Sequence, residues 1–575
     1  MEITASIDIS ATQRQILLDL LGKHLVNTQV WAFGSRVKWT TRSNSDLDLV
    51  VFSSPEQSSQ VSALKEALEE SNLPFRVDLL VWDKLPENFQ RNIEESYVVL
   101  VGGDDVEQVE FMGSKWSLIS IDKIKAESRS AISIGPFGSN MKSDCYVNEG
   151  IPVIRGTNIA AGPTFKGEFV YITEELADRL RSSNVYQYDL VFPHRGSIGE
   201  VGIILDNTRY VISSSLMKLT CDRSKVSPKF LYYFFKSSLG RHELLKNASQ
   251  VGTPGIGQPL ASLKSIEFRL PPLEIQNQIE SILTSLDDKI ELNHQLNKTL
   301  EQIAQALFKS WFVDFEPVKA KIAAKQAGAN AEQIEQAALC AISGKTPEQL
   351  AQLNPQILQQ LKTTAALFPD ALVDSELGEI PEGWEIVRFK QIVEKYIDNR
   401  GKTPPIVDSG IPLLEVKHLP DHSIKPNVNT DKFVNDETYK TWFRAHLNSE
   451  DLIISTVGTI GRLCMVPKGI KIAIAQNLLG LRFDRAFTSP YFMYFLMDGK
   501  RFRDDVNNRL VITVQASIKR QDLETIDLLS PPITLQNKFE SFVKPFVEMQ
   551  QSDETFKLSQ LRDSLLPKLL SGELL

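Results

Sequence analysis

The pattern of apolar and polar positions changes twice along the chain. In the first hundred residues, apolar side chains at helical spacing in 11–24 predict a helix. Short apolar runs then predict strands at 28–33, 45–52 and 75–82. A helix around 64–70 separates the last two of these strands. This order predicts a small mixed α/β domain.

Three aspartates of this domain fall on two neighbouring predicted strands. Asp46 and Asp48 are two residues apart on one strand, so their side chains point to the same face, and Asp78 lies midway along the next strand. Converging carboxylates repel one another unless a cation compensates, and oxygen ligands suit Mg²⁺. Gly34 and Ser35 close the preceding strand, where a backbone without a Cβ could approach a phosphate. The pattern predicts a site for metal-dependent phosphoryl displacement, although isolated Asp-x-Asp pairs also occur on exposed edge strands.

The rest of the chain is a duplication with a period near 260 residues. PPLEIQNQIES from Pro271 recurs as PPITLQNKFES from Pro531. DLVFPHRGSIGEVG from Asp189 recurs as DLIISTVGTIGRLC from Asp451. We call 113–270 the first copy and 384–530 the second copy, and we expect short strands, glycine turns and short helices in both.

A long helix is predicted after each Pro-Pro pair. Residues 273–315 carry apolar side chains mostly three and four apart, which is typical of a coiled-coil seam. The predicted seam residues are Ile279, Ile282, Leu286, Leu296, Leu300, Ile303 and Leu307. The partner helix offers Phe539, Phe542, Phe546, Met549, Leu558, Leu561 and Leu565. The two helices are expected to pair, although two separate amphipathic core helices would give a similar pattern.

Composition narrows the functional classes. The chain has 575 residues, 42% of them hydrophobic and 23% charged, which excludes a disordered or purely coiled-coil protein. Its four cysteines are far apart, which argues against a disulfide framework and favours the cytoplasm. The net charge of -9 is uneven: residues 1–112 hold 9 Lys and Arg against 18 Asp and Glu, and both copies are mildly basic. A basic balance permits phosphate binding but does not establish it.

The N-terminal motif resembles that of the minimal nucleotidyltransferases of the DNA polymerase β-like superfamily. That family has Gly-Ser, then Asp-x-Asp, then a later Asp, here Gly34, Ser35, Asp46, Asp48 and Asp78. The resemblance spans about residues 10–100. It implies transfer of a nucleotide from an NTP with Mg²⁺, with catalytic and metal-binding roles for the three aspartates and a nucleotide-binding role for Gly34 and Ser35.

The duplicated part resembles the specificity subunit of type I restriction–modification enzymes. The carriers are GPFGS (135–139), GIPVIRGTNI (150–159), RGSIGEVGII (195–204), LPPLEIQNQI (270–279), FKSWFVDFEPV (308–318) and ALVDSELGEIPEGW (371–384). The resemblance implies two target-recognition domains that each read half of a split, asymmetric site in double-stranded DNA. It also implies that the helices set the spacing and dock two methyltransferase subunits, which bind S-adenosylmethionine, and that an endonuclease/translocase subunit completes the complex.

The expected fold class is therefore α+β and multidomain, with antiparallel coiled-coil helices between two mixed α/β domains. The expected boundaries are a nucleotidyltransferase-like domain (1–108), recognition domain 1 (113–270), spacer helix 1 (271–316), a helical linker (317–380), recognition domain 2 (381–530) and spacer helix 2 (531–575). No stretch is long and apolar enough to predict a membrane helix.

Base reading requires side chains that reach the edges of the grooves. Cationic candidates in predicted loops are Lys142, Arg155, Arg195, Arg400, Lys402, Lys417, Arg462 and Arg509. Each could equally contact a phosphate or be an ordinary surface cation.

The chain has no P-loop motif and no NPPY or DPPY motif, so cleavage and methylation are assigned to other chains. Two alternatives stay open. Nucleotidyl transfer, of a toxin–antitoxin or phage-defence type, could be the principal activity, with the duplicated part delivering it to DNA. The N-terminal domain could also be an inert docking domain.

Overall fold

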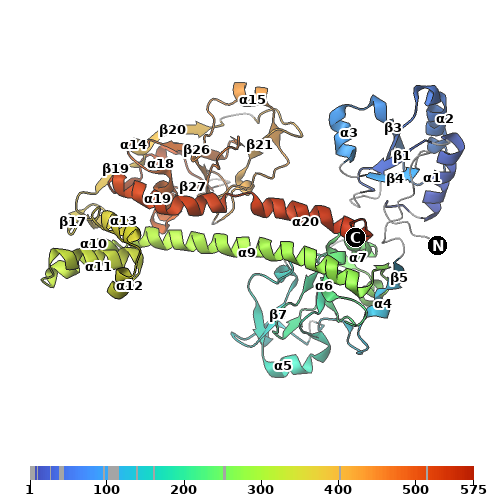
Figure 1. Cartoon of the computed structure of the whole chain (residues 1–575), viewed down its shortest axis with the longest axis horizontal. Coiled ribbons are helices and arrows are strands. Elements are labelled where there is room, and N and C mark those ends of the chain that lie inside the picture. Colours follow the sequence, from blue (N-terminus) through green and yellow to red (C-terminus); the bar gives the residue numbers. More distant parts are fainter. Residues whose placement is uncertain are drawn as a thin grey trace. The chain divides into compact units, whose positions relative to one another are not determined.

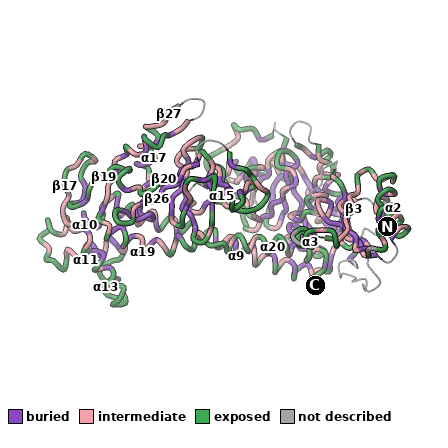
Figure 2. Tube along the Cα trace, turned by 90° about the horizontal axis from the view of Figure 1, so that it is seen from above, coloured by how far each residue is buried: buried purple, intermediate pink, exposed green. Residues whose placement is uncertain are grey.

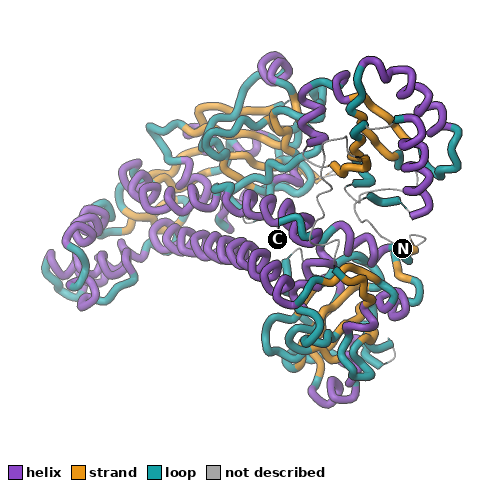
Figure 3. Tube along the Cα trace, turned by 45° about the vertical axis from the view of Figure 1, so that its right-hand side comes forward, coloured by secondary structure: helices purple, strands orange, loops and turns teal. Residues whose placement is uncertain are grey.

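The computed structural model describes residues 7–9, 11–25, 28–37, 45–94, 97–101, 116–137, 140–159, 162–249, 254–399, 403–421, 423–512 and 516–574. The chain divides into two compact units. Figure 1 labels the helices and strands of both. Unit 1 contains residues 1–290 and 556–575, and unit 2 contains residues 291–555. In Figure 3, a long helix stands out from the separate small sheets of the chain.

The N-terminal domain of unit 1 is a four-stranded sheet, ordered β3-β2-β1-β4, with helices packed on it. Leu17 and Leu21 of the first helix and Leu64 of the second are almost fully buried against inward residues of β2. The helices are α1 (Ala11–His24), α2 (Ser58–Glu69) and α3 (Glu87–Glu94), and the strands are β1 (Val30–Phe33), β2 (Leu47–Val51), β3 (Val77–Val81) and β4 (Tyr97–Val101). The strands predicted from the apolar runs are all present.

The first copy has two four-stranded sheets, ordered β11-β10-β13-β6 and β8-β7-β12-β9. Its strands are β5 (Ser117–Ser120), β6 (Ile132–Ile134), β7 (Ile151–Ile154), β8 (Val170–Ile172), β9 (Asn184–Val185), β10 (Leu190–Pro193), β11 (Gly202–Ile203), β12 (Tyr210–Ile212), β13 (Leu216–Leu219), β14 (Ala248–Ser249), β15 (Gly255–Ile256) and β16 (Glu267–Leu270). Its helices are α4 (Ile121–Ile124), α5 (Glu174–Arg179), α6 (Pro228–Lys236), α7 (Ser238–Leu245) and α8 (Pro259–Lys264).

The second copy, in unit 2, repeats this plan with sheets ordered β20-β26-β23-β24 and β22-β21-β25. Its strands are β19 (Glu385–Arg388), β20 (Val393–Asp398), β21 (Ile411–Leu414), β22 (Phe433–Val434), β23 (Leu452–Ser455), β24 (Leu463–Met465), β25 (Ala473–Ile474), β26 (Leu478–Phe483), β27 (Val511–Ile512), β28 (Ala516–Ser517) and β29 (Asp527–Ser530). Its helices are α14 (Phe389–Ile392), α15 (Asp436–Thr441), α16 (Pro490–Asp498), α17 (Lys500–Asn507) and α18 (Arg520–Leu523).

Each copy is closed by an antiparallel pair between its first and last strands. In the first copy β5 pairs with β16, and in the second copy β19 pairs with β29. The closing strand leads directly into the Pro-Pro pair, so the chain enters the next helix from the same point of each copy.

The segment between the copies is helical, as its Ala- and Gln-rich sequence predicts, until it ends in a hairpin. Its helices are α10 (Glu316–Gln326), α11 (Ala331–Ser343), α12 (Pro347–Ala351) and α13 (Pro355–Ala365), followed by strands β17 (Leu372–Ser375) and β18 (Gly378–Pro381). Trp311, at the end of the preceding helix, is fully buried in the core that these helices share with the second copy.

The helix after the first Pro-Pro pair is α9 (Leu273–Phe312), 40 residues long. Within each unit it runs antiparallel to the helices after the second Pro-Pro pair. In unit 1, Ile279 and Leu283 share a core with Leu566 and Leu569. In unit 2, the side chain of Gln550 donates to the carbonyl of Asn297.

The predicted seam of α9 is only partly correct. Ile282, Leu296 and Ile303 are 40%, 39% and 48% exposed. Figure 2 shows green, exposed stretches of the tube beside the α9 label. The buried stripe is Gln276, Ile279, Leu283, Asp287, Ile290, Asn293, Leu300, Ala304 and Phe308. Its polar members have partners, which an apolar pattern cannot reveal: in unit 1 Asp287 accepts from Arg562 at 2.7 Å, and in unit 2 Asn293 donates to Glu554 at 3.0 Å.

The prediction of one long helix after the second Pro-Pro pair is wrong. The structure has two helices, α19 (Ile533–Gln550) and α20 (Glu554–Ser571). The chain breaks at residues 551–553, where the Ser552 hydroxyl accepts from the Glu554 amide at 3.2 Å, as serine does ahead of a helix start. Phe539 is fully buried as predicted, whereas Met549 and Leu561 are about half exposed.

Candidate functional sites

The aspartates of the N-terminal domain gather where β2 and β3 run in parallel. Asp48 and Asp78 are direct partners in the strand register. Gly34, with φ +80°, follows β1 on the other side of β2, and a Cβ on it would lie 2.2 Å from the Asp48 carboxylate. A glycine is therefore required at this position both for its left-handed backbone and for the room that Asp48 needs.

The electrostatics of this edge centre on Asp48. Burial, then the charges of Asp78 and Asp46, raise the pKa of its carboxyl above the usual value. Asp78 forms an exposed ion pair with Arg76 at 2.9 Å. Among the residues that the structure describes, no three His, Cys, Asp or Glu side chains are grouped closely enough to hold a metal ion. Asp48 and Asp78 fit as a pair of carboxylates to which substrate phosphates would add further oxygen ligands.

Arg36 is a positioning residue that the sequence reasoning missed. It follows Gly34 and Ser35 in a turn, and its buried guanidinium donates to the carbonyls of Asp8 and Ser45, both at 2.7 Å. The ring of Phe75 lies 3.9 Å away. Arg36 thus links the Gly-Ser turn to the start of β2. The sequence signal that could have identified Arg36 is its place directly after Gly34 and Ser35.

In the first copy, a buried glutamine fastens the start of α6 to α9; this start, Ser227-Pro228, recurs 262 residues later as Ser489-Pro490. Gln276 is fully buried, accepts from the Ser227 amide at 2.7 Å and donates to the Pro271 carbonyl at 2.8 Å. The Ser227 hydroxyl also hydrogen-bonds to Glu280. We call this set of contacts the glutamine clasp.

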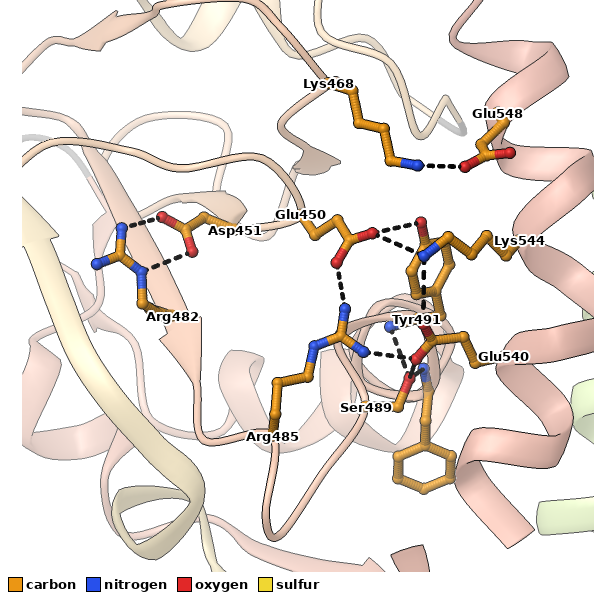
Figure 4. Close-up of polar contacts among 11 residues, drawn as sticks. Glu450, Asp451, Lys468, Arg482, Arg485, Ser489, Tyr491, Glu540, Lys544 and Glu548 are labelled. Atoms are coloured by element: carbon orange, nitrogen blue, oxygen red, sulfur yellow. Dashed lines mark hydrogen bonds and ion pairs between the residues drawn. The ribbon is translucent and has the colours of Figure 1, made fainter. Parts of the chain in front are cut away.

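The second copy repeats the glutamine clasp residue for residue. Gln536 is fully buried, accepts from the Ser489 amide at 3.1 Å and donates to the Pro531 carbonyl at 2.7 Å. The Ser489 hydroxyl donates to Glu540 at 2.7 Å (Figure 4). These are the residues whose recurrence first reveals the duplication in the sequence, so the repeated motif is the joint between each copy and its helix.

An ion-pair network surrounds the second clasp (Figure 4). Arg485 bridges Glu450 and Glu540, and Lys544 donates to Glu450 at 3.1 Å. Burial alone would raise the pKa of Glu450, but the Lys544 hydrogen bond and the Arg485 charge hold it below its usual value. Tyr491 adds a hydrogen bond to Glu450 at 3.1 Å.

The first copy has different side chains at the positions of Glu450 and Arg485. Tyr188 stands 262 residues before Glu450, and both have the left-handed backbone that non-glycine residues rarely adopt. Arg223, 262 residues before Arg485, lies over the Tyr188 ring at 4.7 Å. A cation–π contact thus replaces an ion pair on the same backbone.

The structure places the predicted DNA-contacting cations in two groups. Lys142 and Arg195 are exposed. The others that are described contact the protein itself: Arg155 donates to the Glu168 carbonyl, Lys417 pairs with Asp431 and Glu415, Arg462 donates to the Leu419 carbonyl, and Arg509 pairs with Asp505. Arg400 and Lys402 lie outside the described residues.

Known proteins match the duplicated part and the N-terminal domain of the chain separately. A model of the type I restriction modification DNA specificity domain matches residues 138–302. The HindI specificity subunit of the type I restriction enzyme of Haemophilus influenzae is 30% identical over 404 residues, which cover 67% of this chain and 86% of that protein. The chain belongs to the family of type I restriction enzyme specificity subunits. A crystal structure of an S subunit from M. genitalium covers 81% of this chain and 98% of its own, at 14% identity and a TM-score of 0.45, too low a likeness to add to this assignment.

The N-terminal domain makes this specificity subunit a fusion. Residues 18–106 match a model of polymerase β-type nucleotidyltransferases. The probable protein adenylyltransferase MntA of Haemophilus influenzae is 42% identical over 97 residues, which cover 17% of this chain and 85% of that protein. The expected pairing of a nucleotidyltransferase domain with a specificity subunit is confirmed. None of the described helices has the length and apolar character needed to span a membrane.

Proposed function

We propose that this chain selects the DNA site of a type I restriction–modification complex, with each copy reading one half of a bipartite, asymmetric sequence. The observation that carries the proposal is the duplicated glutamine clasp, which fastens each of two related domains in the same way to the helix that follows it. Related domains with different side chains at matched positions suit a target whose two halves differ. The mildly basic balance of both copies supports contact with DNA.

The helices are the proposed ruler between the half-sites. A helix of 40 residues spans about 60 Å at about 1.5 Å per residue, and its length varies far less than that of a flexible linker. We accordingly place the recognition domains at 113–270 and 381–530, the first spacer helix within 271–316, and the second spacer, made of α19 and α20, within 531–575.

The same helices are the proposed docking surface for two methyltransferase subunits, which would bring S-adenosylmethionine, and the endonuclease/translocase subunit would join that assembly. Exposed apolar side chains on the helices support this role, because such side chains commonly mark protein interfaces. In unit 1 these are Ile282, Phe556 and Leu561, and in unit 2 they are Leu292, Leu296, Ile303 and Met549. Its place of action would be the cytoplasm, where its DNA lies.

A binding selection tests the proposal. The chain is co-purified with the methyltransferase encoded beside it, incubated with random duplex DNA, and the bound DNA is sequenced. We expect two unlike half-site motifs at a fixed gap. Inserting one heptad into α9 and one into the paired helix keeps the helix phase within about 20° and adds about 10 Å, so the gap should grow by about three base pairs. A selection without sequence preference refutes the assignment, and an unchanged gap refutes the ruler.

We propose, second, that the N-terminal domain transfers a nucleotide from an NTP. Gly34, Ser35, Asp46, Asp48 and Asp78 match the motif, and the pairing of Asp48 with Asp78 on adjacent strands favours a bound cation. Mg²⁺ at Asp48 and Asp78 would neutralise the charge of the reacting phosphates. Asp78 is the carboxylate proposed to activate the acceptor, and Ser35 offers its amide and hydroxyl to a phosphate.

Labelling separates an active domain from a docking domain. The chain is incubated with α-labelled NTP and Mg²⁺ beside an Asp46→Ala/Asp48→Ala variant, with its partner subunits present as acceptors. We expect label transfer from the natural chain alone. Equal labelling of both would refute nucleotide transfer and leave docking as the role of the domain.

A further inference from the structure

A polar pocket of about 350 Å³ opens at one end of the main sheet of the second copy. β20 and β23 both run antiparallel to β26, so the ends of the first two strands meet the start of the third. The pocket is lined there by Asp398 and Asn399 after β20, Thr456 after β23, and Gln476 and Asn477 before β26. Such a convergence of loops on a rigid sheet is a common place for recognition.

Three amide side chains in this pocket, those of Asn399, Gln476 and Asn477, have no partner in the described part of the chain, and the first two differ most from the first copy. Asn399 is only 7% exposed, and neither its amide nitrogen nor its amide oxygen has a hydrogen bond there. Gln476 is exposed at the mouth and is likewise free within the described residues. The amide atoms of Asn399 are not enclosed by protein, so they face the pocket and are available to a ligand that supplies a donor and an acceptor.

The charges of the pocket argue against an anionic ligand. Its arginine, Arg520, is already held by Glu524 at 2.7 Å and by the ring of Tyr396 at 3.9 Å. The Asp398 carboxylate also lines the pocket. A neutral base edge therefore suits the pocket better than a backbone phosphate. Free Asn and Gln amides match the donor and acceptor pattern of an adenine edge.

The first copy keeps the backbone of this place and changes its chemistry. His194 corresponds to Thr456: the His194 amide donates to the Ser215 carbonyl and the Thr456 amide to the Asn477 carbonyl, both at 2.9 Å. Instead of Asn399 the first copy has Gly135, which lies so close to Ser213 that a Cβ would be 2.0 Å from the Ser213 carbonyl oxygen.

Serines 213–215 of the first copy stand at the positions of residues 475–477, which carry the Gln476 and Asn477 amides. The His194 ring contacts the Ser214 carbonyl at 3.0 Å. Constant backbone with divergent polar side chains is what two readers of different sequences require.

We propose that the pocket lined by Asn399 and Gln476 receives the edge of an adenine in one half of the DNA site, and that these two amides determine the preference for it. The inference rests on the proposed DNA-reading function and adds the residues and the base. Discrimination from a pair of amide hydrogen bonds to adenine is expected to be about tenfold at that position.

The binding selection described above is repeated with variants of the full chain and its methyltransferase. In Gln476→Ala and Asn399→Ala, the preference for adenine at one position of one half-site should fall about tenfold, with the other half-site and the gap unchanged. In Gln476→Glu, the same position should come to favour cytosine, whose amino group a carboxylate accepts. Asn429→Ala, an exposed amide of the same copy outside the pocket, is the matched control and should leave the motif intact.

The outcomes separate the two proposals. A natural chain that selects no motif refutes the DNA-reading function and this inference with it. A natural chain that selects a bipartite motif, with Gln476→Ala and Gln476→Glu selecting the identical motif, refutes the inference alone. Gln476 is exposed, so its variants should fold even if Asn399→Ala does not. A change in both half-sites, or the same change in Asn429→Ala, would also overturn the assignment to this pocket.

Discussion

The glutamine clasp gives the sharpest test of how a recognition domain is fastened to its helix. Replacing Gln276 with leucine keeps the side-chain volume roughly constant but removes the acceptor of the Ser227 amide and the donor to the Pro271 carbonyl. Gln276 is fully buried, so water cannot replace these bonds without entering the joint. A buried group left unsatisfied costs about 1–3 kcal/mol, so we expect about 3 kcal/mol for the pair.

Hydrogen exchange is the suitable assay, because a chain of several domains has no single free energy of unfolding. A local loss of about 3 kcal/mol should speed exchange roughly a hundredfold at the start of α6 and of α9. Gln278→Leu, an exposed position on the same helix, is the matched control and should change little. Gln536→Leu should weaken the second copy in the same way and leave the first unaffected. If Gln276→Leu exchanges like Gln278→Leu, the clasp does not hold the domain.

Three further predictions concern a buried histidine, a glycine beside Asp48 and the ion pair between α9 and α20. Burial lowers the pKa of His194, so the unfolded first copy binds protons more readily than the folded one, and its stability should fall as pH drops below about 6.5. The unfolding transition of the first copy should lose less Tm between pH 7.5 and 5.5 in His194→Gln than in the natural chain, and an equal loss would contradict this. Gly34→Ala should abolish nucleotide transfer by displacing the adjacent carboxylate, whereas Gly22→Ala, in open space on a helix, should keep activity and gain roughly 0.5–1 kcal/mol of stability. Asp287→Ala should destabilise the helix pair of unit 1 by about 2 kcal/mol, seen as faster exchange in α20, and exposed Asp288→Ala should not.

The sequence predicted what depends on local pattern and repetition. The strands that carry Asp48 and Asp78 are short apolar runs, and the long helix follows an apolar period of three and four residues, so both elements could be located in advance. The Pro-Pro repeats located the duplication because the residues that recur, such as Gln276 and Gln536, are the ones that form the joint.

Features that depend on tertiary partners could not be predicted in this way. The seam of α9 shifts because Asp287 and Asn293 find partners on other helices, and a polar residue in a heptad predicts exposure when its partner is unknown. The second helix breaks at Ser552, a single local contact that outweighs the helical period around it. The pocket around Asn399 joins loops far apart in the sequence, and no spacing motif marks such a site.

The two copies also show which features of the fold are kept by physical necessity. Asp189 and Asp451 stand 262 residues apart, are both buried, and each accepts from the backbone amide three residues earlier. In the first copy Thr220 donates to the aspartate at 2.6 Å, with Lys218 at 3.9 Å, and in the second copy Arg482, at the position of Thr220, donates to it at 2.8 and 3.1 Å.

A buried carboxylate must be compensated, and each copy has met that demand with a different cation at a different position. The scaffold thus tolerates exchange of side chains wherever the compensation is preserved. The pocket shows the opposite behaviour, because there the amides of the second copy have no internal compensation at all in the described residues. Where side chains differ between the copies but keep an ion-pair or hydrogen-bond partner, they stabilise the fold. Where they differ and have no partner within the described residues, they are available to bind a target.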